Sequence, residues 1–107
     1  MTVKWRWLCA LAALASPALA ADDAQSGEGK KLFGEATPAC ALCHTLGAAG
    51  AAGTVGPSLD ELKPDATRVA TALRNGVGNM PSYKATLSEA QIMSLARYVA
   101  RASGGEK

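Results

Sequence analysis

The sequence predicts an all-α fold, and three observations support this. The segments that follow Asp65 and Ser88 carry apolar residues at the spacing of helices that bury one face. Each of these segments starts with a residue typical of an N-cap and ends before a glycine. No segment alternates polar and apolar residues over the length of a strand. We therefore expect one small helical domain, without a sheet, in this chain of 107 residues.

The C-terminal helix has the clearest signals. Ser88 and Gln91 have the spacing of a capping box, and Leu87 and Ile92 flank it as a hydrophobic staple does. Gly104 is the expected end of the helix. Its apolar stripe consists of Ile92, Leu95, Ala96 and Val99.

A second helix is predicted after Asp65, to Arg74 or Asn75, with Gly76 at its C-terminal end. Its apolar positions are Ala66, Val69, Ala70 and Leu73. A short helical turn is expected at 59–62, before Pro64. The residues 76–85 are then predicted to form a loop.

An N-terminal helix is expected over residues 27–35, after a polar tail at 21–26. Gly29 and Phe33 share one face of this helix. A glycine there indicates either close packing or fraying near the terminus. Pro38 separates this helix from a further one that starts near residue 38 or 39, and the Gly/Ala-rich segment 47–56 is predicted to be a flexible surface loop.

Residues 1–20 have the pattern of a cleaved signal peptide. Lys4 and Arg6 precede the apolar segment 7–15, and Ala18-Leu19-Ala20 is a small-x-small cleavage site. The apolar segment is too short to span a bilayer. We therefore expect an exported, periplasmic domain at residues 21–107. Of the 11 basic residues, 9 remain once the two leader cations are removed, and they balance the 9 acidic residues. No binding to nucleic acid or to an anionic membrane is therefore expected.

Cys40-Ala41-Leu42-Cys43-His44 is a C-x-x-C-H haem-attachment motif. Cysteines one helical turn apart can bond both vinyl groups of a haem, and His44 then lies under the iron. The alternatives are a redox dithiol or half of a zinc site. A structural zinc site usually needs four cysteine or histidine ligands. The chain has one histidine, and its only cysteine outside the motif is Cys9 in the leader. A thioredoxin-like dithiol needs a βαβ context, and the sequence shows none.

The second axial ligand of such a haem has two candidates. His44 is the only histidine, so a second imidazole from this chain is excluded. Met80 lies in a loop where glycines and Pro81 favour a tight backbone path. Met93 lies beside the apolar stripe of the last helix, where methionine usually fills gaps. We expect Met80 to bind the metal and Met93 to pack, which closes the iron and favours electron transfer.

Together these residues resemble class I c-type cytochromes over residues 27–102. The resemblance rests on the attachment motif, on Gly56-Pro57-Ser58-Leu59, on Asn79-Met80-Pro81, and on the pairs Gly29 with Phe33 and Leu95 with Tyr98. It implies a cytochrome c-like helical domain around one covalent haem c. Cys40 and Cys43 would bond the haem, and His44 and Met80 would bind iron. The carbonyl of Pro57 would accept the histidine N–H, and Leu59 would contact the haem.

The chain departs from the family pattern at two points. Ser58 stands where the family commonly has asparagine. Residues 21–107 contain no tryptophan to reach a haem propionate. The candidates for that role are Arg74, Asn79, Tyr83 and Lys84.

The segments 53–65 and 74–81 are similar to the small monohaem subunits or acceptors of bacterial sulfite dehydrogenases, which are molybdenum enzymes. The resemblance implies an electron carrier, not itself an enzyme, between a dehydrogenase and an oxidase or another cytochrome. The loops at 47–56 and around Met80 are the candidate docking surface. The alternatives are a haem enzyme or ligand sensor with a labile methionine ligand, and a permanent subunit of a dehydrogenase complex.

Overall fold

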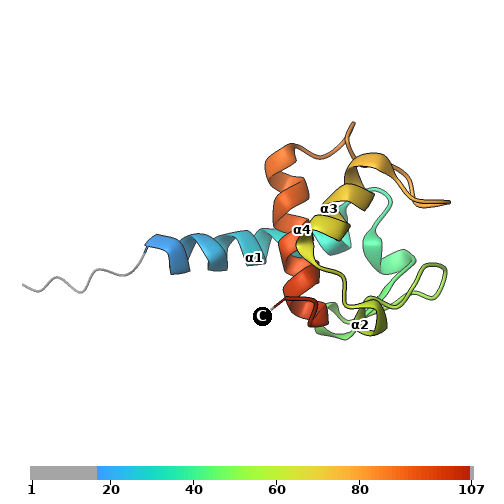
Figure 1. The fold of residues 1–107 in the computed structure, drawn as a ribbon, viewed down its shortest axis with the longest axis horizontal. Helices are drawn as coiled ribbons and strands as arrows, with labels where there is room; N and C mark the ends of the chain where they lie inside the picture. Colours follow the sequence, from blue (N-terminus) through green and yellow to red (C-terminus); the bar gives the residue numbers. More distant parts are fainter. Residues whose placement is uncertain (1–16, 107) are drawn as a thin grey trace, which may run out of the picture.

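The structure, a computed structural model, describes residues 17–106, so the n-region and apolar segment of the predicted signal peptide lie outside it. The helices are α1 (Pro17–Glu35), α2 (Leu59–Leu62), α3 (Ala66–Asn75) and α4 (Glu89–Ser103), with 3₁₀ turns at Cys40–Leu42 and Gly47–Ala49. The strands β1 (Thr45–Leu46) and β2 (Ala51–Ala52) form a small hairpin. The fold is mostly helical, as predicted (Figure 1).

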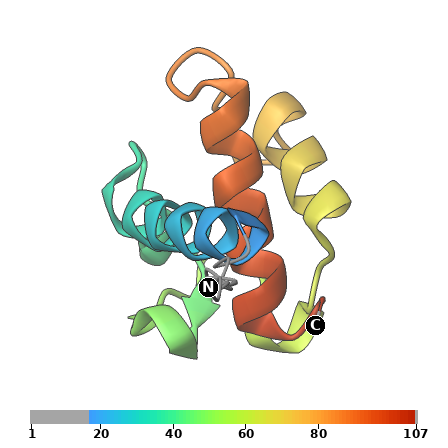
Figure 2. The same cartoon turned by 90° about the vertical axis from the view of Figure 1, so that its left-hand side faces the viewer.

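The helices α1 and α4 cross each other at Gly29, and this crossing organises the domain (Figures 1 and 2). A Cβ on Gly29 would overlap the carbonyl oxygen of Ser94 and the Cβ of Tyr98. The rings of Phe33 and Tyr98 pack edge to face, with centroids 6.2 Å apart. Gly29 is therefore a close-packing residue and not a sign of fraying.

The helix α3 packs beside α4, on another side from α1 (Figure 2). It begins where the Asp65 carboxylate accepts a 2.8 Å hydrogen bond from the Arg68 amide. It ends at Gly76, whose φ of 74° suits glycine. Leu73 is fully buried. Both predicted ends of this helix are confirmed.

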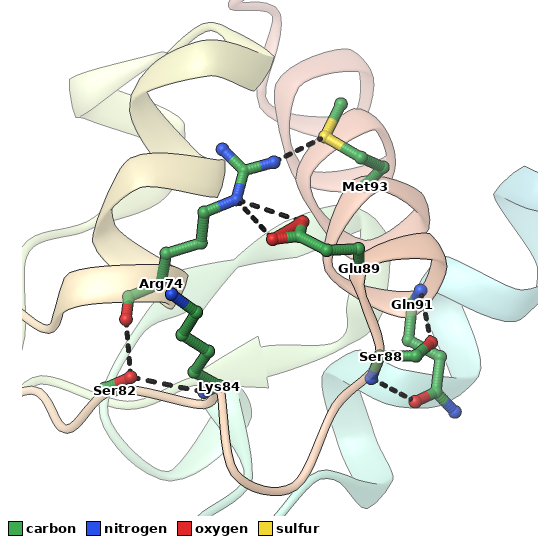
Figure 3. Close-up of polar contacts among 7 residues, drawn as sticks. All are labelled: Arg74, Ser82, Lys84, Ser88, Glu89, Gln91 and Met93. Atoms are coloured by element: carbon green, nitrogen blue, oxygen red, sulfur yellow. Dashed lines mark hydrogen bonds and ion pairs between the residues drawn. The ribbon is translucent and has the colours of Figure 1, made fainter.

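The helix α4 has the predicted capping box (Figure 3). The Ser88 hydroxyl accepts a bond from the Gln91 amide at 3.1 Å, and the Gln91 side chain accepts one from the Ser88 amide at 2.8 Å. Gly104 ends the helix in the left-handed region, with φ 89°. The predicted apolar stripe is buried along its whole length: Ile92, Leu95, Ala96 and Val99.

The start of α1 differs from the prediction. Within the described residues α1 is helical from Pro17 to Glu35, so the polar tail expected at 21–26 is wrong. Residues 17–26 are rich in alanine, the strongest helix former. The N-terminal turns of α1 extend away from the rest of the domain (Figure 1). The alanine content favours the helical conformation of this stretch.

The segment after Pro38 also differs, because the expected helix is only a 3₁₀ turn at Cys40–Leu42. The chain leaves this turn at His44, enters β1 and returns through β2, with Leu46 opposite Ala51. Both of these residues are buried. The expectation of no strand is therefore wrong here. The predicted surface loop at 47–56 is mostly exposed, as expected, but it contains the strand β2. Strands of two residues are too short for an alternating pattern to reveal.

None of the described helices combines the length and apolar character needed to cross a membrane.

Candidate functional site

A cavity of about 470 Å³ lies between α3, α4 and the two loops that face them. The predicted site residues all line it: Cys40, Cys43, His44, Pro57, Leu59 and Met80. Most of the remaining wall is apolar, and Phe33, Leu73 and Leu95 form its buried side. This volume and lining are those of a site for an organic cofactor.

Cys40 and Cys43 are free thiols on this wall, the first buried and the second half-buried. Burial raises the pKa of the Cys40 thiol to about 11, and the nearby Cys43 sulfur also raises it. Cys40 is thus protonated at neutral pH. Nucleophilic redox dithiols need the opposite, a lowered thiol pKa. The described residues also contain no cluster of three or more His, Cys, Asp or Glu that could hold a metal ion.

The imidazole of His44 is held by the chain around Pro57. Its Nδ1 donates a hydrogen bond to the Pro57 carbonyl oxygen at 2.8 Å, because a carbonyl only accepts. Gly56 packs against the ring so closely that a Cβ there would lie 2.5 Å from His44 Cε1. The Gly56 amide in turn donates to the Cys43 carbonyl at 2.6 Å. Nε2 remains for a metal, in the arrangement expected of a ligating histidine.

Met80 reaches the cavity through a tight turn. Val77 and Met80 exchange two backbone hydrogen bonds, of 3.0 and 2.8 Å, and Gly78 between them has φ 55°. Met93 does not line the cavity. Its sulfur instead accepts a 3.5 Å hydrogen bond from the Arg74 guanidinium (Figure 3). Of the two methionines, only Met80 therefore shares a wall with the attachment motif.

The four candidates for a propionate partner differ in position. Arg74 is paired with the Glu89 carboxylate, 2.9 Å away (Figure 3). The Tyr83 hydroxyl donates to a backbone carbonyl. Asn79 and Tyr83 line the cavity, whereas Arg74 and Lys84 do not.

Arg68 is a cavity residue that the sequence reasoning missed. It is the only charged side chain on the cavity wall among the described residues, where it forms no ion pair. Arg68 lies one helical turn before Ala72, another lining residue, but no signal in the sequence shows which side of α3 faces the cavity.

These residues fit a haem c. The wall offers two unpaired thiols near each other, an imidazole with a fixed Nδ1 and a free Nε2, and a thioether. Haem iron with histidine and methionine ligands is typical of electron-transfer cytochromes. The apolar wall suits the porphyrin faces, and Arg68 suits a carboxylate.

The comparisons with known proteins agree with this chemistry. The family model described as cytochrome c oxidase, cbb3-type, subunit III matches residues 24–99. The crystal structure of the c-type cytochrome SorU from Sinorhizobium meliloti is similar, with 48% identity and a TM-score of 0.74. The match covers 77% of this chain and 94% of SorU. A comparison with curated protein sequences found no significant match.

The predicted family, fold and cofactor are thus confirmed. The family match spans most of the chain, and the similarity to SorU extends over nearly all of that protein. The chain belongs to the class I c-type cytochromes, as a small helical electron-transfer domain with one covalently bound haem c.

Proposed function

We propose that this protein is a periplasmic monohaem carrier, which takes single electrons from a dehydrogenase and passes them to an oxidase or another cytochrome. Residues 1–20 would be a cleaved signal peptide and residues 21–107 the mature domain. The proposal rests on one observation: the attachment motif and Met80 line the same cavity. A His/Met pair leaves no open iron position for substrate, which suits a carrier and not an enzyme.

Each site residue has a distinct role in this proposal. The bound haem supplies one-electron oxidation and reduction at its iron. The sulfurs of Cys40 and Cys43 would hold the haem covalently, and His44 and Met80 would bind its iron. Pro57 fixes the imidazole through its carbonyl oxygen, 2.8 Å from Nδ1. Leu59, which is buried, excludes water from the haem face.

Arg68 is our proposed partner for a haem propionate. Its place on the cavity wall and its lack of an ion pair within the described part of the chain support this role. A guanidinium can bind a carboxylate through two parallel hydrogen bonds. Of the earlier candidates, Arg74 is less suitable because Glu89 already occupies its guanidinium.

The mouth of the cavity suits transient docking of redox partners. Val55 is 80% exposed and Val77 is 62% exposed, although both line the cavity. They belong to the two loops expected to meet partners. Small, partly apolar contacts are typical of electron-transfer complexes that must separate quickly.

A sulfite dehydrogenase is our proposed electron donor. The sequence similarity to cytochrome acceptors of these molybdenum enzymes supports this choice. The test mixes the oxidised cytochrome with a purified bacterial sulfite dehydrogenase and sulfite, and follows haem reduction. Reduction at a rate that saturates with cytochrome concentration supports the assignment. No reduction beyond that of a mixture without the dehydrogenase would exclude this donor.

Two alternatives have separate tests. A ligand sensor or haem enzyme with a labile methionine would bind cyanide or carbon monoxide at low concentration. A permanent subunit would co-purify with its dehydrogenase in a fixed ratio. The carrier proposal predicts a free cytochrome that resists both ligands.

A further inference from the structure

Tyr83 connects two parts of the site that are far apart in the sequence. Its hydroxyl donates a 2.6 Å hydrogen bond to the carbonyl oxygen of Pro38, which closely precedes Cys40. Tyr83 itself closely follows Met80, and its side chain lines the cavity. The bond therefore joins the segment that carries the methionine to the segment that carries the attachment motif.

Tyr83 is also firmly fixed on its own side. Its amide donates to the Leu73 carbonyl at 2.7 Å, and its carbonyl accepts from the Leu87 amide at 2.8 Å. The neighbouring Ser82 hydroxyl donates to the Arg74 carbonyl at 2.5 Å (Figure 3). Tyr83 is only 4% exposed and is firmly held at the C-terminal end of the loop that carries Met80.

The loop that precedes Tyr83 and carries Met80 is held by fewer backbone hydrogen bonds. Between Gly76 and Tyr83, the backbone bonds are those of the turn that joins Val77 to Met80. Asn79 and Pro81, on either side of Met80, are exposed. The hydrogen bond from Tyr83 to Pro38, at the C-terminal end of this loop, therefore ties the loop to the segment that carries the attachment motif.

We propose that Tyr83 is a positioning residue, whose hydrogen bond to Pro38 holds the loop closed and so keeps Met80 on the iron. This inference rests on the proposed function, because it takes Met80 as the axial ligand. Burial raises the pKa of Tyr83 to about 12, so the phenol keeps its proton and remains a donor at physiological pH.

The consequence is measurable through exogenous ligands. Imidazole binds ferric iron only when Met80 has left it, so its apparent affinity reports the population of the open loop. A typical hydrogen bond contributes modestly to stability, and its loss should tighten imidazole binding about 2- to 10-fold. The sharpest variant is Tyr83→Phe, which removes one oxygen atom and keeps the buried ring.

The chain offers a matched control at its other tyrosine. The Tyr98 hydroxyl is buried but has no hydrogen-bond partner among the described residues. Tyr98→Phe therefore makes the same chemical change without breaking a bond. Ser88→Ala is a second control, because it removes the cap of α4 and lowers global stability without touching the Tyr83–Pro38 bond.

The experiment titrates ferric holoprotein with imidazole for the wild type, these three variants and Met80→Ala. The proposal predicts tighter binding in Tyr83→Phe and wild-type affinity in Tyr98→Phe and Ser88→Ala. Unchanged affinity in Tyr83→Phe, with a large increase in Met80→Ala, would overturn the role of Tyr83 and leave Met80 as the ligand. Unchanged affinity in Met80→Ala as well would overturn both. Equal tightening in Ser88→Ala would show a global effect and also overturn it.

Discussion

The Nδ1 atom of His44 lies 2.8 Å from the carbonyl oxygen of Pro57, and Gly56 presses against the same imidazole ring. One short segment therefore fixes both the tautomer and the plane of the histidine. Because the hydrogen bond leaves Nε2 as the free nitrogen, it prepares the ring for a metal before any metal binds.

Gly56→Ala is expected to disturb the iron site. The new Cβ would lie 2.5 Å from Cε1 of His44, so the ring or the backbone must shift. Such overpacking typically costs about 1–3 kcal/mol. We expect a lower yield of holoprotein and an altered haem absorption spectrum.

The control for this variant is Gly47→Ala. A Cβ at Gly47 comes no closer than 3.4 Å to the Asp60 carboxylate, which is an ordinary contact. Its haem spectrum should match the wild type. A wild-type spectrum in Gly56→Ala would show that the segment does not constrain His44.

Gly29→Ala is expected to separate α1 from α4. Its Cβ would overlap Ser94 and Tyr98, so the helices must move apart at a cost of about 1–3 kcal/mol. Urea unfolding of the holoprotein measures the loss. Gly34→Ala is the matched control in the same helix, because its Cβ meets nothing within 4 Å. That variant should gain about 0.5–1 kcal/mol from helix propensity. Equal stability of the two variants would contradict the close crossing.

The ion pair between Arg74 and Glu89 predicts a pH dependence. The Arg74 guanidinium, through its hydrogen bonds, lowers the pKa of the Glu89 carboxyl. The carboxylate is therefore favoured in the folded state, and its contribution is present above the unfolded pKa and disappears as the pH falls through the folded one. Glu89→Gln should be slightly less stable than the wild type at pH 7 and equal to it once Glu89 is protonated.

Salt provides a second check on this exposed pair. Added salt at pH 7 should shrink the stability difference between the wild type and Glu89→Gln, because the charges are screened. If the difference in stability persists both at low pH and in high salt, it arises from helix capping or packing and not from the ion pair.

Arg68→Gln is expected to lower the reduction potential of the haem. Loss of a cation near a propionate leaves its negative charge uncompensated, and this favours the ferric state. The propionate pKa should also rise, so the potential should depend more strongly on pH near neutrality. Potentiometric titration at several pH values measures both effects.

Two variants control for charge alone. Arg68→Lys should retain most of the wild-type potential. Arg97→Gln removes an exposed cation of α4 that does not line the cavity, and should change the potential much less. Equal shifts in Arg68→Gln and Arg97→Gln would reject a direct propionate contact.

The sequence predicted well those parts of the fold that depend on local chemistry. Asp65 and Ser88 are N-caps because their side chains accept hydrogen bonds from amides three residues later. This local pattern can be predicted from residue type and spacing. The six predicted site residues line one cavity, which agrees with the fixed spacing of the attachment motif and the small number of other ligands in the chain.

Other features depend on contacts that the local sequence does not contain. The β1–β2 hairpin forms because Leu46 and Ala51 are buried together, not because of strand propensity. Arg68 was missed because its role depends on which side of α3 faces the cavity. The bond from Tyr83 to Pro38 joins residues 45 positions apart in the sequence, and no spacing rule predicts it.

The central claim is that His44 and Met80 together hold the haem iron in a closed site. The most direct test compares absorption spectra of ferric and ferrous holoprotein for the wild type, Met80→Ala and Met93→Ala. We predict a covalent c-type haem in all three, and loss of the methionine-ligand absorption band in Met80→Ala only. The same band in Met80→Ala as in the wild type would contradict this account.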